Sequence, residues 1–186
     1  MSKDPTPYAE ALARARSLVA ALGPACERVL IAGSLRRKKA MVGDLELVVI
    51  PNVRPVIDMF GSPAGTESLL DLALIGLGLS YTKNGPKFKQ FAWEGMSCDL
   101  FICTPETWAV NATLRTGCAD FSQWLVTPRQ QGGAKPGHLD FRDGQLLSAG
   151  RPLDVATEEE LFQAMDIRWL PPEARTPERT ATLWRR

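Results

Sequence analysis

Apolar positions recur along the chain with two different spacings, and each spacing predicts a type of element. Over residues 8–22 they recur every three or four positions, which is typical of an amphipathic helix. Asp4-Pro5 precedes this stretch as a capping residue followed by proline, and Gly23-Pro24 follows it, so we expect the helix to fill the interval. A second apolar helix is expected over residues 66–79, with Thr66 as its N-cap.

Short apolar runs bounded by glycine or proline predict strands. Residues 28–33, 44–51 and 96–104 are such runs, and their length and flanking residues favour buried strands over helices. Asn84-Gly85-Pro86 is a turn signal with alternating residues beyond it, which predicts a hairpin. Asp143-Gly144 predicts a second hairpin farther along the chain.

Capping residues place the remaining elements. Thr104-Pro105 predicts a helix start, and Thr157 with Glu160 forms a capping box ahead of an apolar helix face. Residues 52–65 are expected to form an irregular loop. Residues 176–186 are expected to form a loosely held tail.

The order of these elements predicts an α+β protein with a mixed sheet. Strands and helices alternate over about the first 105 residues, and a smaller α+β lobe follows, so we expect domains at 1–105 and 106–186. The 186 residues are 45% hydrophobic and 23% charged, an ordinary globular composition. A net charge of +1 argues against a protein that simply coats nucleic acid, although a local basic stripe would still be compatible with it.

Targeting signals and cysteines add little chemistry. The first ten residues lack an apolar signal-peptide core, and the longest apolar run, LLDLALIGLGL, has eleven residues against the about 20 that a membrane helix needs. We therefore expect a cytoplasmic monomer without a membrane partner, in the host-cell cytoplasm if the protein is viral. The four cysteines lack the paired short spacings of a zinc site, which favours reduced, buried thiols.

Three carboxylates lie in predicted strands. Asp44 and Glu46 are two positions apart, so a strand projects both to one face while Leu45 and Leu47 point into the core. Asp99 is the only charge in the apolar run CDLFI, where burial is costly without a partner. If the three acids converge, two Mg²⁺ ions would relieve their repulsion and could clamp a phosphoryl transfer.

A glycine turn and a basic segment precede the first two acids. Gly33-Ser34 follows a predicted strand directly, and backbone N–H groups in such turns can bind phosphate. The Ser34 hydroxyl and the Arg37 guanidinium suit phosphate oxygens as well. Each feature alone is commonly a solvated surface, but their succession along one segment favours a catalytic site.

These motifs resemble the nucleotidyltransferase superfamily, and in particular the X family of DNA polymerases, the DNA polymerase beta-like enzymes. The family pattern is G-S-x-R-R, six residues and D-x-D, and here residues 33–46 read GSLRRKKAMVGDLE. The third family acid matches Asp99, and residues 114–121, LRTGCADF, match the family's aromatic pair and T-G-S motif at the start of the thumb. Residues 157–175 resemble the end of that thumb, so the resemblance covers almost the whole chain.

The resemblance implies a catalytic palm, a small thumb and a two-metal reaction. Asp44, Glu46 and Asp99 would be the catalytic residues and would hold two Mg²⁺ ions, with Mn²⁺ as a substitute, and Asp99 would lie nearest the primer. The residues implied to bind the incoming (d)NTP are Gly33, Ser34, Arg37, Leu114, Arg115, Thr116, Gly117 and Cys118. The chain has no counterpart of the family's lyase or helix-hairpin-helix domain, so we expect low processivity.

Departures from the family pattern concern the sugar and the nucleic acid. Leu114-Arg115 replaces the aromatic pair, which predicts weaker exclusion of ribonucleotides, and Cys118-Ala119 replaces serine and the acid. Glu46 replaces the second aspartate, so Glu46→Asp should stay active with an altered rate or metal preference. The residues expected to contact nucleic-acid phosphates are Lys83, Lys87, Lys89 and Arg129.

Three functions compete. The first is a minimal DNA polymerase that extends a DNA primer on a template, in repair or in replication of a small genome. The second is a template-independent nucleotidyltransferase that modifies a DNA or RNA end or another hydroxyl. The third is a non-catalytic nucleic-acid-binding module, which retention of all three acids disfavours.

Overall fold

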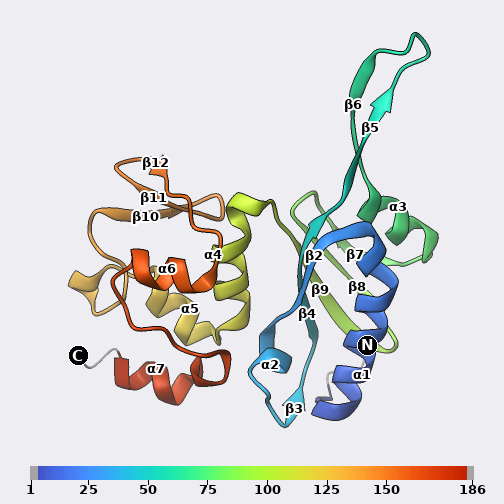
Figure 1. Ribbon diagram of the computed structural model, residues 1–186. Helices are drawn as coiled ribbons and strands as arrows, with labels where there is room; N and C mark the ends of the chain where they lie inside the picture. Colours follow the sequence, from blue (N-terminus) through green and yellow to red (C-terminus); the bar gives the residue numbers. More distant parts are fainter. Residues whose placement is uncertain (1–3, 184–186) are drawn as a thin grey trace.

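The computed structural model describes residues 4–183 and has an α+β architecture (Figure 1). Its main sheet has five strands in the order β2-β4-β9-β8-β7. The central pair β4 and β9 is parallel, and the other neighbours are antiparallel, so the sheet is mixed as expected. These strands are β2 (Cys26–Ile31), β4 (Leu45–Pro51), β7 (Tyr81–Asn84), β8 (Phe88–Trp93) and β9 (Met96–Ile102).

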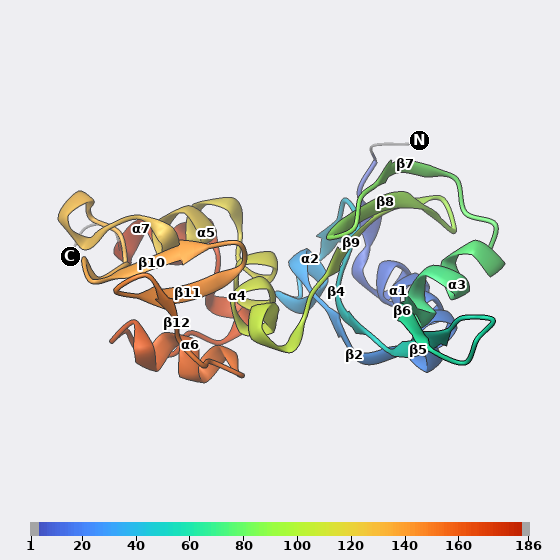
Figure 2. The same cartoon turned by 90° about the horizontal axis from the view of Figure 1, so that it is seen from above.

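Helices α1 (Tyr8–Leu22) and α3 (Leu69–Gly76) cover one face of this sheet (Figures 1 and 2). The fully buried side of α1 consists of Ala11, Ala15, Leu18 and Leu22, and it packs on Leu45, Leu47 and Leu100 of the sheet. Burial of these side chains is the main stabilising contribution at this face. The helix begins at Tyr8, because the preceding β1 (Thr6–Pro7) pairs with β3 (Met41–Val42).

Helix α4 (Pro105–Thr116) begins where predicted and covers part of the opposite face of the sheet. Trp108 and Ala112 pack on Val48 and Phe101, while Ala109 and Val110 belong to the core of the second lobe. The two lobes therefore share one helix (Figure 2).

The second lobe combines short helices with a small antiparallel sheet. Its Asp143-Gly144 turn has positive φ at both residues and joins two strands, as predicted. The Thr157–Glu160 capping box is also confirmed. The elements are α5 (Ala119–Val126), η2 (Arg129–Gln131), β10 (Leu139–Arg142), β11 (Gln145–Ser148), β12 (Arg151–Pro152), α6 (Glu158–Ala164), η3 (Pro172–Ala174) and α7 (Pro177–Leu183).

Two segments differ from expectation. Residues 52–65 were expected to be an irregular loop, but β5 (Val53–Ile57) and β6 (Pro63–Ser68) form a projecting hairpin (Figure 1). Its prolines are compatible with strands because β5 and β6 form a two-stranded sheet, in which both are edge strands. The hairpin runs through the expected cap Thr66, so the N-cap of α3 is Ser68, whose hydroxyl accepts a hydrogen bond from the Asp71 N–H.

The expected loose tail was also wrong for its described part, because residues 177–183 form α7, which packs against α5 and buries Thr180. Residues 184–186 lie outside the described part. All four cysteines are buried and free, as predicted. Within residues 4–183, no helix is both long and apolar enough to cross a bilayer.

Candidate active site

The central parallel strand pair brings two of the predicted acids together. Glu46 on β4 is the register partner of Asp99 on β9, so both side chains project to the same face. Asp44 directly precedes β4 and lies two residues before Glu46, so its side chain projects to the same face as that of Glu46. Leu45 and Leu47 are fully buried on the opposite face, which confirms the orientation expected from the sequence.

Burial and neighbouring carboxylates raise the pKa of two of the acids. Burial, followed by the negative charge of Asp44, raises the pKa of Glu46 to about 7. Burial and the charge of Asp99 also raise the pKa of Asp44. Arg37 opposes both shifts. The three carboxylates therefore interact electrostatically, and a positive charge among them would stabilise their ionised forms.

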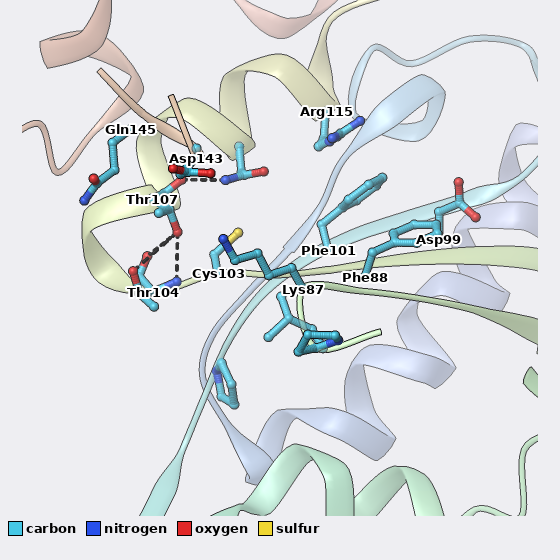
Figure 3. Close-up of a pocket in the computed structure, with 15 residues that line it drawn as sticks. Lys87, Phe88, Asp99, Phe101, Cys103, Thr104, Thr107, Arg115, Asp143 and Gln145 are labelled. Atoms are coloured by element: carbon cyan, nitrogen blue, oxygen red, sulfur yellow. Dashed lines mark hydrogen bonds between the residues drawn. The ribbon is translucent and has the colours of Figure 1, made fainter. Parts of the chain in front are cut away.

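Asp99 is oriented by a residue that the sequence analysis missed. Gln90 on β8 is its register partner, and Gln90 Nε2 donates a hydrogen bond of 2.7 Å to Asp99 Oδ1. The pairing of β8 with β9 brings the two residues together, and no motif in the sequence indicates it. Figure 3 shows Asp99 at the side of a cleft between the sheet and α4.

Gly33 makes room for the Glu46 side chain. The glycine begins the short helix α2 (Gly33–Arg36) with a φ of +59°, a conformation that favours glycine. A Cβ added there would overlap Glu46 Oε2. The longer stem of glutamate therefore brings the carboxylate against the glycine turn.

The basic segment is used differently from what was predicted. Arg37 was expected at phosphate, but its Nη1 donates to the carbonyls of Thr116 and Gly117, at 2.6 and 3.0 Å. Arg36 donates to the Thr116 hydroxyl at 2.7 Å and pairs with Glu158. These contacts bind α2 to the end of α4.

Two buried polar atoms beside this segment have no partner. They are the Ser34 hydroxyl and the Arg37 Nε, which has no hydrogen-bond acceptor. Buried polar groups are normally paired. A bound anion would supply acceptors for both, so the predicted phosphate site fits this part of the molecule.

Two cavities flank the acids. The Glu46-side cavity has a volume of about 630 Å³, and the Asp99-side cavity, drawn in Figure 3, has a volume of about 920 Å³. Arg115 lines both, and its guanidinium stacks 4.0 Å from the centre of the Phe101 ring. Of the residues expected to bind the nucleotide, the Glu46-side cavity is lined by Arg37, Leu114, Arg115, Gly117 and Cys118.

Two of the expected nucleotide contacts have structural roles. Thr116 is fully buried and uses its hydroxyl and its carbonyl to bind Arg36 and Arg37, so it does not line either cavity. Cys118 is the N-cap of α5, and its Sγ accepts a hydrogen bond from the Phe121 N–H. The thiol therefore performs the capping role for which a serine is usually suited.

The four expected nucleic-acid contacts do not form one surface. Lys87 lines the Asp99-side cavity, and Lys83 lies over the ring of Phe88, 5.6 Å from its centre. Lys89 is buried, donates to Asn84 Oδ1 at 2.5 Å and pairs with Asp71 at 3.1 Å, so its ammonium group is engaged within its own lobe.

Arg129 is occupied within the second lobe. Its guanidinium donates to the carbonyls of Ala134, Met165 and Asp166. These bonds connect the segment after α5 to the end of α6, which is a structural role.

The donors fit a hard divalent cation, since three carboxylates are the oxygen ligands that Mg²⁺ prefers. Within residues 4–183, however, no three acidic, histidine or cysteine side chains are arranged as a ready-made metal site. The chain matches no known protein-family model and no curated protein. The geometry of this site is therefore the main indication of function.

Proposed function

We propose that this chain is a nucleotidyltransferase of the X-family DNA polymerase type, with residues 1–105 as the palm and 106–186 as the thumb. The observation that carries the proposal is the convergence of Asp44, Glu46 and Asp99 from adjacent strands, with Glu46 lining one cavity and Asp99 the other. Burial, followed by the charge of a neighbouring acid, raises the pKa of Glu46 and of Asp44. Such perturbed acids in a cleft are typical of functional sites.

The proposed reaction joins a primer to a nucleoside monophosphate. The 3′-hydroxyl oxygen of the primer attacks the α-phosphorus of a (d)NTP, the bond from that phosphorus to the bridging oxygen breaks, and pyrophosphate leaves. Asp99 would accept the hydroxyl proton. Asp44, Glu46 and Asp99 would hold two Mg²⁺ ions, which when bound neutralise the charge that develops on the phosphoryl oxygens.

The two cavities suggest separate places for the two substrates. The Glu46-side cavity is lined by Arg37, whose buried Nε has no acceptor among the described residues, which favours the triphosphate there. The Asp99-side cavity then takes the acceptor end. Arg115 lies between them where family members have an aromatic residue, so we expect ribonucleotides to be accepted better than by those members.

A template-independent transferase is the second candidate. Of the four basic residues expected to contact nucleic acid, Lys89 is buried and Arg129 is bound within its own lobe. A protein with fewer phosphate contacts binds a long duplex with lower affinity, which favours a short or single-stranded acceptor.

Primer extension with Mg²⁺, with dNTPs or rNTPs and with or without template, tests these functions. Incorporation that follows the template supports the polymerase, and untemplated tailing supports the second candidate. Asp44→Ala and Asp99→Ala should lower incorporation by at least about 100-fold, since even the loss of outer-shell partners costs about 10–100-fold. Glu46→Asp should stay active with an altered rate or Mg²⁺/Mn²⁺ preference.

The exposed Asp154 gives a matched control, because Asp154→Ala removes a carboxylate that lines neither cavity. It should leave incorporation unchanged. Wild-type rates in Asp44→Ala would contradict the catalytic assignment. An inactive wild-type protein with every primer, template and metal would refute both enzymatic functions.

A further inference from the structure

Lys39, the last of the four basic residues 36–39, lines the Glu46-side cavity. The other three are occupied. Arg36 and Arg37 bind the end of α4, and Lys38 pairs with Glu173 at 2.7 Å. Among the described residues, no ion pair within 4.0 Å includes Lys39.

The backbone of Lys39 is fixed on both sides. Its N–H donates to the Ser34 carbonyl at 3.0 Å, and the Lys38 N–H donates to the Leu35 carbonyl at 3.0 Å. Lys38 has a φ of +56°, so the segment ends α2 with the left-handed turn that usually contains glycine. On the other side, the Tyr8 N–H donates to the Ala40 carbonyl at 2.9 Å.

This anchoring separates Lys39 from an ordinary surface lysine. A lysine on a mobile loop loses much side-chain and backbone freedom when it binds a ligand. Here the backbone freedom is already lost in the fold, so that only the side chain is left to order. Pre-positioned groups bind with a smaller entropic cost.

We propose that Lys39 is the side-chain cation that binds the outer phosphates of the incoming nucleoside triphosphate. The proposal rests on the proposed function and adds a residue to its nucleotide site. Three observations support it: Lys39 lines the cavity that Glu46 and Arg37 also line, its backbone is anchored, and Nη1 of Arg37 is committed to carbonyls. The ammonium would pair with the phosphates that leave as pyrophosphate.

The charged surroundings of Lys39 offer a competing role. The pKa of Glu178 on α7 is lowered by its own backbone N–H and by Thr176, with a smaller contribution from the charge of Lys39. Lys39 could therefore serve only to attract α7. Glu178→Gln removes that partner and leaves the cavity lining unchanged.

Equilibrium binding of dATP and dAMP in Mg²⁺ buffer tests the proposal, because only dATP carries the outer phosphates. Lys39→Ala should weaken dATP binding by about tenfold and leave dAMP binding unchanged. In the reverse reaction it should raise the KM for pyrophosphate by a similar factor. Lys39→Arg should retain most of the affinity, and Lys38→Ala, which removes the same charge one residue away, should retain all of it.

Several results would overturn the assignment. Equal weakening of dATP and dAMP, a Lys38→Ala effect as large as that of Lys39→Ala, or a loss reproduced by Glu178→Gln would each do so. So would weakened primer–template binding with normal dATP binding, since that places Lys39 on a nucleic-acid phosphate.

The two proposals can fail separately. Wild-type incorporation with an unchanged Lys39→Ala variant refutes the Lys39 role alone. Wild-type dATP binding that depends on Lys39, without incorporation into any acceptor, refutes the polymerase and retains the phosphate site. If the wild-type protein binds no dATP, both proposals are wrong.

Discussion

At the scale of single residues, Glu46 and Gly33 depend on each other. The glutamate stem extends its carboxylate over the α-carbon of Gly33, and any side chain at position 33 would overlap it. A shorter aspartate at position 46 would withdraw the carboxylate from that contact. The choice of glutamate is therefore linked to the geometry of the glycine turn.

This dependence predicts a measurable coupling. Gly33→Ala should destabilise the protein by about 1–2 kcal/mol from its positive φ alone, and by more because the new Cβ meets Glu46. In a Glu46→Asp background, only the cost of the positive φ should remain, because the clash with the Glu46 side chain is removed. Urea unfolding of the wild type, both single variants and the double variant gives the coupling energy.

Gly23→Ala is the control for this cycle. Gly23 has a φ of −51°, and nothing lies within 4 Å of an added Cβ. This variant should unfold with wild-type stability or be slightly stabilised. Additive costs of Gly33→Ala and Glu46→Asp would show that the two residues do not interact.

The sequence was most informative where the period of a strand decides which residues share a face. It placed Asp44 and Glu46 together with Leu45 and Leu47 opposite, and the structure agrees. It could not show that Lys89 faces Asp71, or that Arg129 bonds to the end of α6, because those contacts depend on tertiary packing. The same limit hid Gln90, which meets Asp99 only through strand pairing.

At the scale of elements, the β5–β6 hairpin contributes little to the core. Every residue of β5 is exposed, and Met59 and Phe60 at the tip are 89% and 85% exposed. An isolated two-stranded ribbon is only marginally stable in water. The prolines and turn-forming residues of this segment are typical of a loop. In addition, an exposed two-stranded ribbon lacks the alternation of apolar and polar residues that marks a strand packed on a core.

Removal of this hairpin should therefore be tolerated. Replacing residues 54–66 by a short glycine-serine link should change the free energy of unfolding by less than about 1 kcal/mol, as for surface changes away from packed groups. Thermal unfolding measures this, with Leu70→Ala as the comparison. Leu70 is fully buried, so its truncation should cost about 2–5 kcal/mol. A hairpin deletion as costly as Leu70→Ala would contradict this view of the ribbon.

At the scale of the whole molecule, Glu158 connects the two lobes. It pairs with Arg36 of α2 and accepts a hydrogen bond of 2.6 Å from Arg175. Arg175 is fully buried, and its guanidinium lies 4.9 Å from the Trp169 ring centre. Burial by itself raises the pKa of Glu158, but Arg36 and Arg175 outweigh it, so the net pKa lies below its ordinary value.

Glu158→Gln should destabilise the protein by about 3 kcal/mol at neutral pH, because it leaves buried arginine charge uncompensated. A carboxylate with a lowered folded pKa stabilises above its unfolded pKa, and this contribution is lost as the pH falls through the folded value. The difference between wild type and variant should therefore shrink below about pH 4. Urea unfolding from pH 7 to pH 3 checks this.

Glu159→Gln is the matched control, since Glu159 is the exposed neighbour on the same helix turn. It should change stability by only a few tenths of a kcal/mol, in the range of about 0–1 kcal/mol typical of surface ion pairs. A pH-independent effect of Glu158→Gln would mean that lost packing, and not lost charge, is responsible.

Because α4 belongs to both cores, the two lobes are not interchangeable modules. The face of α4 with Trp108 and Ala112 completes the first lobe, while Ala109 and Val110 complete the second. A chimaera in which all residues after 105 came from another protein would also lose the α4 side chains that pack on the first lobe. A transplanted second lobe would have to keep the Trp108 face of this chain, so the evolution of one lobe is tied to that of the other through this shared helix.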